Sequence, residues 1–294
     1  MYGQSLKRLL LAFALPLLLN ACASRGIPQP LQTGEQPEAR ALLLESAKAH
    51  GLDAWQSIRD ISVSYAGEWY GLVSKVQPTL IDAEFRQGSQ ERLILGETPI
   101  IAQHHEGPGG NKQVIRPVAG VEVFYNGVAT YNMDKKAAAA LVADGYRMFL
   151  TGPFHFLSSN LHLEMGEPDE VDGRACITLV AVRRPGHGLS TEDRYQLYID
   201  REDKLLRRVR FSMEGLDSTK GAIAEVDFFE HQKIAGVVWP TRFHERLKKP
   251  IPNLPVHDWR LTGLDTNRGI HAAEISGIAL SGRALAPAKA LPAP

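Results

Sequence analysis

The histidines of this chain are the first residues to search for chemistry, because imidazole can bind a metal ion or transfer a proton. The chain has ten, and the densest group is His104-His105-Glu106, followed by a glycine-rich stretch over 107–111. Adjacent histidines in a strand point to opposite faces, so they could share one ion only in a loop. We interpret this group as a solvated loop tip between strands, and we predict no metal site.

The known hydrolase motifs are incomplete or missing. His244-Glu245 lacks the second histidine of the zinc-hydrolase motif, because Lys248 stands at its position. Neither a Gly-x-Ser-x-Gly elbow nor a phosphate-binding loop ending in Gly-Lys-Ser/Thr occurs. The acid pairs Asp169/Glu170 and Glu202/Asp203 fall in turn-like segments, which predicts solvated surface. We therefore predict no catalytic residues and no cofactor, while a catalytic cluster assembled from distant positions stays an alternative.

The two cysteines have different surroundings. Cys176 lies in the apolar run Ala175–Val180, which predicts a strand and a small buried side chain. A catalytic thiol would need a nearby base, and none can be identified. Cys22 ends the segment Leu19-Asn20-Ala21-Cys22 near the N-terminus. Two cysteines in such different settings exclude a disulfide framework.

The first 22 residues have the layout of a secretory signal: Lys7 and Arg8, then an apolar run from Leu9 to Leu19. The run is shorter than the roughly 20 apolar residues that span a bilayer. Leu19–Cys22 resembles the lipobox of bacterial lipoproteins, although Asn20 replaces the usual Ala or Ser. This resemblance implies cleavage after residue 21 and acylation of Cys22. A plain signal peptide with an incidental cysteine is the alternative.

Lipidation would determine where the protein resides. Ala23 follows Cys22, whereas Asp at this position retains bacterial lipoproteins in the inner membrane. The resemblance therefore implies an outer-membrane lipoprotein, held by N-terminal acyl chains and facing the periplasm. We predict a signal peptide over 1–21, a lipidated tether over 22–37, one domain over 38–282 and a disordered Ala/Pro-rich tail over 283–294.

Composition limits the class of partner. Lys plus Arg and Asp plus Glu both number 33, so the chain is neutral, and it lacks the basic footprint of a nucleic-acid-binding protein. Apolar residues make up 44% of the chain, enough for a sizeable core.

Helical patterns occur near the N-terminus and in the middle of the chain. A helix is predicted over 38–50 and should end at Gly51, and Asp53 is the expected N-cap of a short turn. Asp134 is the expected N-cap of a central helix over 135–143, with a second helical piece over 146–150.

Strand patterns fill the remainder. Residues 61–69 alternate with a period of two, and Asn126-Gly127 is a strong hairpin signal. Further strands are expected over 80–87, 91–95, 112–117, 121–125, 128–133, 161–165, 175–182, 193–199, 206–213, 222–229, 239–245 and 257–262. The order of elements predicts one α+β domain dominated by antiparallel sheet, which must curl at this size.

These elements together resemble the LolA/LolB-like family of lipoprotein carriers. The resemblance implies a curved antiparallel half-barrel sheet with helices packed on its concave face. None of the matching segments is a catalytic signature, and no carrier site residue can be aligned to a position here. The matching segments are 51–55, the strand ending at Trp69, the hairpin over 124–132, 195–200 with 205–209, and 234–241.

Aromatic side chains are the main candidates for function. If side chains alternate between the two faces of each strand as predicted, these aromatic residues lie on or near the concave face, where an apolar cleft could admit acyl chains. The alternative is that they fill the core. The predicted cavity residues are Tyr65, Trp69, Phe85, Tyr125, Phe154, Phe156, Phe211, Phe228 and Trp239, with Trp55 and Tyr195 nearby.

Three hypotheses of function follow. The first is a membrane-anchored lipoprotein that binds or carries an apolar ligand, with a lipid or a lipoprotein as cargo. The second is a non-catalytic scaffold that meets another protein of the cell envelope. The third is an enzyme, which would need a strongly perturbed histidine or carboxylate beside a nucleophile.

Overall fold

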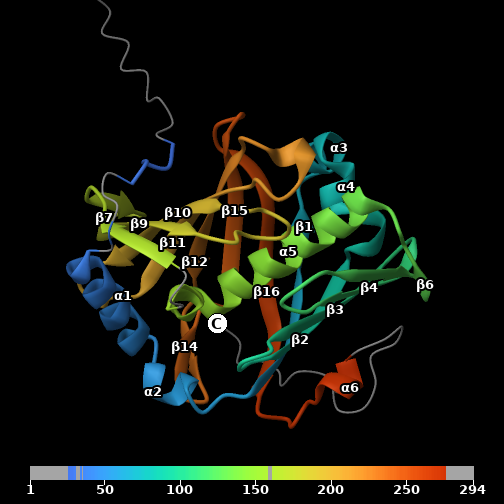
Figure 1. The fold of residues 1–294 in the computed structure, drawn as a ribbon, viewed down its shortest axis with the longest axis horizontal. Coiled ribbons are helices and arrows are strands. Elements are labelled where there is room, and N and C mark those ends of the chain that lie inside the picture. Colours follow the sequence, from blue (N-terminus) through green and yellow to red (C-terminus); the bar gives the residue numbers. More distant parts are fainter. Residues whose placement is uncertain (1–25, 31–33, 35, 158–160, 276–294) are drawn as a thin grey trace, which may run out of the picture.

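The computed structural model describes residues 26–30, 34, 36–157 and 161–275 (Figure 1). The predicted signal peptide, Cys22 and the predicted tail over 283–294 lie outside the described residues. Within the described residues, no helix is long and apolar enough to cross a membrane.

A single antiparallel sheet of 14 strands forms the body of the molecule. Its order is β6-β5-β4-β3-β2-β1-β16-β15-β12-β11-β10-β9-β7, with β8 paired to β9. The strands are β1 (Asp60–Trp69), β2 (Gly88–Ile94), β3 (Ile100–Gly107), β4 (Gly110–Arg116), β5 (Glu122–Tyr125), β6 (Val128–Ala129), β7 (Leu161–Met165), β8 (Asp169–Val171), β9 (Arg174–Arg183), β10 (Asp193–Asp200), β11 (Leu206–Ser212), β12 (Ile223–Phe229), β15 (Arg242–Lys249) and β16 (Leu254–Thr266). A separate hairpin joins β13 (Gln232–Ile234) to β14 (Val237–Trp239).

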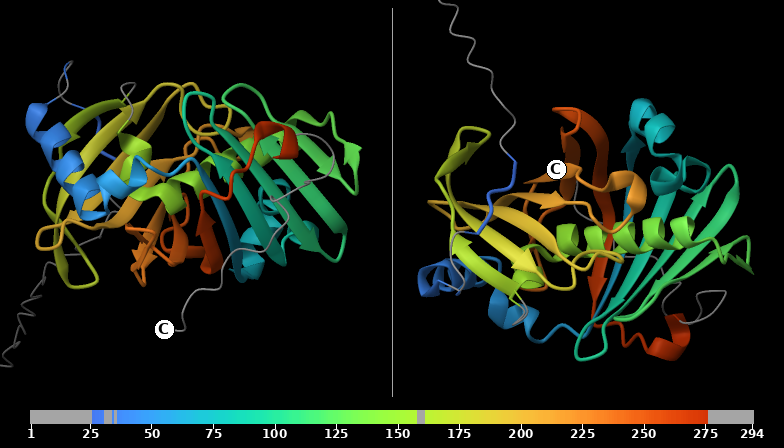
Figure 2. Two further views of the ribbon diagram at one scale, coloured as in Figure 1. Left: turned by 90° about the horizontal axis from the view of Figure 1, so that it is seen from below. Right: turned by 45° about the horizontal axis from the view of Figure 1, so that its top comes forward.

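The long strand β16 joins the two halves of the sheet. It pairs with β1 on one side and β15 on the other, so residues about 200 positions apart, such as Tyr65 and Leu261, become neighbours. The sheet curves around the long helix α5 (Met133–Thr151), which crosses its concave face (Figure 2). The predicted α+β fold, a curved half-barrel with a helix on its concave face, is confirmed.

The remaining helices are short: α3 and α4 pack with α5 against the core, whereas α6 lies on the opposite face of the sheet. Helix α6 packs Ile275 against Ala102 on the face opposite the core. The short helices are α1 (Pro37–Ala49), α2 (Leu52–Trp55), α3 (Gly71–Val76), α4 (Pro78–Ile81), η1 (Ala83–Phe85), η2 (Gly152–Phe156), η3 (Asp217–Thr219) and α6 (Ala272–Ile275).

Helix α1 ends as predicted at Gly51. This residue has φ +92°, and a Cβ there would lie 2.4 Å from the carbonyl oxygen of Gly236, so both the backbone conformation and the close approach require glycine. The prediction of Asp53 as an N-cap is wrong. Helix α2 begins at Leu52 with Gly51 as its N-cap, so Asp53 lies inside the helix.

The central helix differs from its prediction in two ways. Residues 133–151 form one continuous helix, because Asp144 and Gly145, which separated the two predicted pieces, are helical. The N-cap is Asn132, whose side chain accepts a hydrogen bond from the Lys135 backbone N–H at 2.9 Å. Asp134 therefore lies in the first turn, where its charge still favours the helix dipole.

Four strand or loop predictions are also wrong. The strand predicted over 80–87 is replaced by the end of α4, by η1 and by two residues that lead into β2, because Pro78 begins a helix and Asp82 turns the chain at φ 51°. The return strand of the Asn126-Gly127 hairpin is cut to β6, and Asp169/Glu170 lie in β8. The strand predicted over 239–245 is divided between β14 and β15.

Candidate functional site

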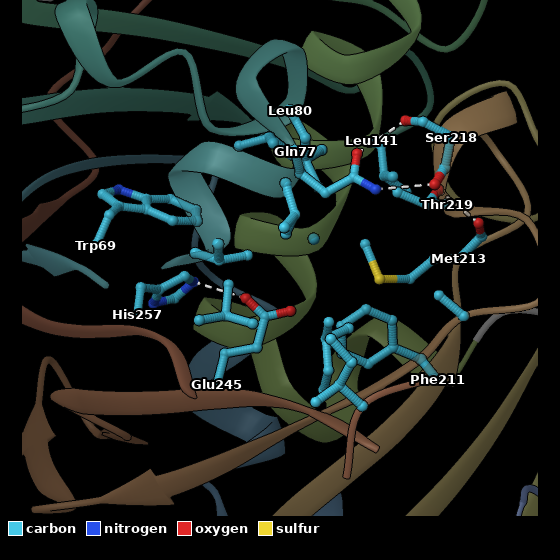
Figure 3. A pocket seen from close by; sticks show the side chains of 18 of the residues that line it. Trp69, Gln77, Leu80, Leu141, Phe211, Met213, Ser218, Thr219, Glu245 and His257 are labelled. Carbon is cyan, nitrogen blue, oxygen red and sulfur yellow. Dashed lines mark hydrogen bonds and ion pairs between the residues drawn. The ribbon is translucent and has the colours of Figure 1, made fainter. Parts of the chain in front are cut away.

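A pocket lies between α3, α4 and α5 on one side and β11, β15 and β16 on the other (Figure 3). Its volume is about 240 Å³. Most of the wall is apolar, and the described residues that supply this surface include Trp69, Val73, Leu80, Leu141, Tyr146, Phe149, Phe211, Met213, Leu247 and Val256.

The helix α5 supplies one wall because of its spacing. Leu141, Gly145 and Phe149 recur every four residues, and Tyr146 lies beside them, so all four share one helix face. The strands supply the opposite wall through their concave side chains. Phe211 contacts Phe149 with ring centroids 6.0 Å apart, so this edge of the pocket is a helix-to-sheet contact.

A close carboxyl–imidazole contact lies in the floor of the pocket. The Glu245 carboxylate Oε2 is 2.8 Å from His257 Nε2, and both side chains are buried (Figure 3). The Trp69 ring meets the His257 ring edge-on at 4.5 Å. The floor therefore offers a polar group to a ligand whose remainder lies against apolar walls.

The mouth of the pocket is formed by exposed lining residues: Val76, Ser218, Lys220, Pro250 and Ile251. Two reciprocal hydrogen bonds cross it. Gln77 Nε2 donates to the Ser218 carbonyl at 2.8 Å, and Ser218 Oγ donates to Gln77 Oε1 at 2.9 Å. This Gln77–Ser218 clasp links the α3–α4 segment to the η3 loop.

A second, much smaller space of about 10 Å³ adjoins the pocket and shares the lining residues Tyr146, Phe149 and His257 with it. Its other lining residues are Tyr65, Phe243 and Trp259. Such a volume is close to that of one water molecule. The buried Tyr65 hydroxyl interacts with Glu91 and the buried Tyr146 hydroxyl with Arg86, whereas His257 Nδ1 is buried without a hydrogen-bond partner among the described residues. Burial raises the pKa of both tyrosines, so these hydroxyls remain protonated donors.

A row of buried polar side chains crosses the concave face beside the pocket, on β2, β3 and β4. Gln103 Nε2 donates to Glu91 Oε1 at 2.6 Å, and His105 Nε2 lies 3.4 Å from Gln103 Oε1. Lys112 Nζ lies 2.6 Å from Asp82 Oδ2. Burial raises the pKa of Glu91 to about 8 and lowers that of Lys112 to about 8. The Glu91 carboxyl is therefore mostly protonated at neutral pH.

Arg86 connects this polar row to the pocket. Its guanidinium carbon lies 5.3 Å from the centroid of the Trp69 ring, and only 4% of the residue is exposed. After burial, the Arg86 charge is the next cause that lowers the pKa of His105 and Lys112. Trp69 thus contacts both the apolar pocket and the charged group beside it.

The structure distributes the nine predicted cavity residues over several places. Trp69 and Phe211 line the pocket, and Tyr65 lines the smaller adjoining space. Phe228 packs against Phe243, with ring centroids 6.0 Å apart. The remaining five pack away from the pocket: Phe85 against Tyr125, Phe154 and Trp239 around Trp55, and Phe156 against Tyr195. Their role in ligand binding stays a prediction.

The sequence search missed most of the pocket wall. The aliphatic and helical members, such as Leu80, Leu141 and Phe149, were not proposed. A signal was present for α5, whose apolar residues at four-residue spacing faced a predicted sheet. No local signal marked Leu80, because its segment was interpreted as a strand.

The histidine pair and the cysteine that were searched for reactivity in the sequence lie in strands of the sheet. His104-His105-Glu106 is not a loop tip but part of β3, and His105 is fully buried while His104 is partly exposed. Burial raises the pKa of the Cys176 thiol to about 11. Among the described residues, no group of three or more His, Cys, Asp or Glu side chains could hold a metal ion.

Comparisons with known proteins identify the fold. No protein-family model and no curated protein matches the chain. A putative outer membrane lipoprotein-sorting protein domain from Vibrio parahaemolyticus matches with a TM-score of 0.50 and 7% identity, over 81% of this chain and 96% of that chain. A LolA superfamily protein from Nitrosomonas europaea matches with a TM-score of 0.49 and 10% identity, over 81% and 97%. The predicted resemblance is confirmed at the level of the fold: the chain shares its curved half-barrel with the Vibrio domain.

Proposed function

We propose that this protein is a membrane-anchored, periplasm-facing lipoprotein that binds or carries an apolar ligand, with an acyl chain held in the pocket. The observation that carries the proposal is the pocket itself, whose walls come from α3, α4, α5 and the concave face of the sheet. Each methylene group that moves from water into such a pocket contributes about 0.8 kcal/mol. The cargo would be a lipid or the acyl chains of a lipoprotein.

Two further observations support the proposal. The fold is shared with a domain whose name describes lipoprotein sorting. The polar floor of Glu245 and His257 would favour a ligand with a polar end. We also propose that the protein is not an enzyme and needs no cofactor.

Native mass spectrometry of the lipidated chain, purified from membranes in mild detergent, tests the function. We expect a population that carries additional acyl-chain mass beyond the covalent lipid, and displacement of that mass by a fluorescent fatty acid. A chain that is folded by circular dichroism, carries no ligand and takes up no fatty acid would contradict the proposal.

The location is a separate proposal and rests on Cys22 and Ala23. Changing Ala23 to Asp should move the protein from the outer to the inner membrane, because the residue after the acylated cysteine is the sorting signal. Fractionation of membranes with an Ala23→Ser control measures this. A protein that stays in the outer membrane after the Asp substitution would contradict the proposed sorting.

The scaffold hypothesis has one observation in its favour. The edge strand β6 and the chain that follows it carry exposed apolar side chains: Val128, Tyr131 and Met133 are 69%, 88% and 64% exposed. An edge strand with such side chains can pair with another protein. A photo-crosslinker at Tyr131 would test this in cells. Recovery of one defined envelope protein would favour the scaffold, and its absence would count against it.

A further inference from the structure

The mouth of the pocket carries large apolar side chains that point outwards. Leu72 and Val76 of α3 are 54% and 49% exposed, and Ile251, in the turn between β15 and β16, is 45% exposed. Val76 and Ile251 also line the pocket, so the apolar wall continues across the mouth to the outside. We call Leu72, Val76 and Ile251 the apolar rim.

Exposed lysines surround this rim. Lys75 lies between Leu72 and Val76 on α3, and Lys249 directly precedes the β15–β16 turn. Lys220 lies at the mouth, where it forms an ion pair with the exposed Asp217. A lysine near an anionic bilayer contributes about 1 kcal/mol of attraction. Apolar side chains among lysines are the combination that binds the interface of an anionic membrane.

The chain also approaches this mouth from its N-terminal side. A Cβ on Gly26 would lie 3.1 Å from Lys249 Nζ and 3.7 Å from Ile223 Cδ1. Ile27 is only 5% exposed, and its carbonyl oxygen accepts a hydrogen bond from Arg194 Nη1 at 3.5 Å. Four peptide units separate Gly26 from Cys22, which span about 14 Å when fully extended. An anchor at Cys22 would therefore hold the mouth close to the membrane.

We propose that the apolar rim docks on the bilayer that holds the lipid anchor, so that the mouth of the pocket opens onto the acyl chains of the membrane. The proposal rests on the proposed function. It adds a route: the ligand enters from the bilayer without exposing its chain to water, which would cost about 0.8 kcal/mol per methylene group. The partner surface is an anionic lipid bilayer.

An environment-sensitive fluorophore on the full lipidated chain tests the docking. It would be attached at Leu72→Cys, with Thr98→Cys as the control in the exposed β2–β3 turn at the opposite end of β1. Selective labelling is expected, because Cys176 is buried and its thiol pKa is raised. The chain would be reconstituted into vesicles of phosphatidylethanolamine and phosphatidylglycerol.

We expect a blue shift and protection from an aqueous quencher at position 72, but neither at position 98. Equal, water-like emission at both positions would overturn the docking. A shift at position 72 that appears only after envelope proteins are added would also overturn it, in favour of a protein partner.

A second variant separates the docking from the proposed function. Leu72 does not line the pocket, so Leu72→Glu should leave fatty-acid affinity in solution unchanged and slow transfer to vesicles severalfold. Leu44→Glu, on the exposed side of α1, is the matched control. If Leu72→Glu binds fatty acid normally in solution and transfers it to vesicles at the wild-type rate, only the docking is overturned. If the wild-type chain itself takes up no fatty acid, the proposed function is contradicted.

Discussion

A large side chain in place of Gly145 should fill the pocket and abolish most of the protein's affinity for an acyl chain. Gly145 lies inside α5 between Leu141 and Phe149 and lines the pocket. A Cβ at this position meets Phe149 Cζ at 3.9 Å, an ordinary contact, so alanine fits without displacement of any neighbour. A leucine side chain is longer and would project into the space that the ligand needs.

The size of the effect follows from the methylene groups that lose their place. A leucine side chain occupies the space of about four ligand carbons, and each is worth about 0.8 kcal/mol of transfer free energy. The expected loss is roughly 3 kcal/mol, or about 100-fold in Kd. Gly145→Ala should instead keep the affinity and stabilise the fold by up to about 1 kcal/mol, because glycine is a poor helix former.

The assay is displacement of a fluorescent fatty acid, measured for the wild type, Gly145→Ala and Gly145→Leu. Thermal unfolding of each variant shows whether the fold is retained. A Gly145→Leu variant that unfolds near the wild-type temperature and binds the probe with unchanged Kd would refute the assignment of the ligand to this pocket. Equal weakening by alanine and leucine would point to altered folding rather than to lost space.

Two further predictions concern the clasp and the polar row. Gln77→Ala removes both hydrogen bonds to Ser218. The fluorescent fatty acid should therefore dissociate severalfold faster, and the free energy of unfolding should fall by about 1 kcal/mol. An unchanged dissociation rate in stopped-flow measurements would refute a gating role for the clasp. Because the pKa of Glu91 rises from 4.5 to about 8 on folding, its contribution to stability is fully present below pH 4.5 and is lost as the pH rises towards 8. Relative to the wild type, the free energy of unfolding of Glu91→Gln should therefore rise by up to a few kcal/mol as the pH increases across that range. If the unfolding free energies of the two proteins changed in parallel with pH, the burial argument would be contradicted.

The elements with strong local signals were predictable from the sequence. The alternation over 61–69 became β1, Asn126-Gly127 became a hairpin with both residues at positive φ, and Gly51 ended α1. The errors occurred where nonlocal packing decided the conformation. Residues 80–87 had the composition of a strand, yet Pro78 and the left-handed Asp82 turn them into helical segments over the polar row.

The site was less predictable than the fold, and Phe211 and Phe228 show the reason. Both are aromatic and lie on the concave face, on the adjacent strands β11 and β12. Phe211 faces the pocket, whereas Phe228 packs against Phe243. Periodicity reports the face of a sheet, but it does not report whether a neighbour fills the space above that face.

The sequence by itself determined the class of fold, the apolar character of the concave face and the lipobox-like segment that ends at Cys22, because each depends on residues close together in the chain. The tertiary structure decided where the apolar face stays unfilled. The pocket walls come from segments as far apart as Trp69 and His257, which become neighbours only when β1 pairs with β16 and α5 crosses the sheet. A pocket is the space that packing leaves open, so its position follows from all of these contacts together.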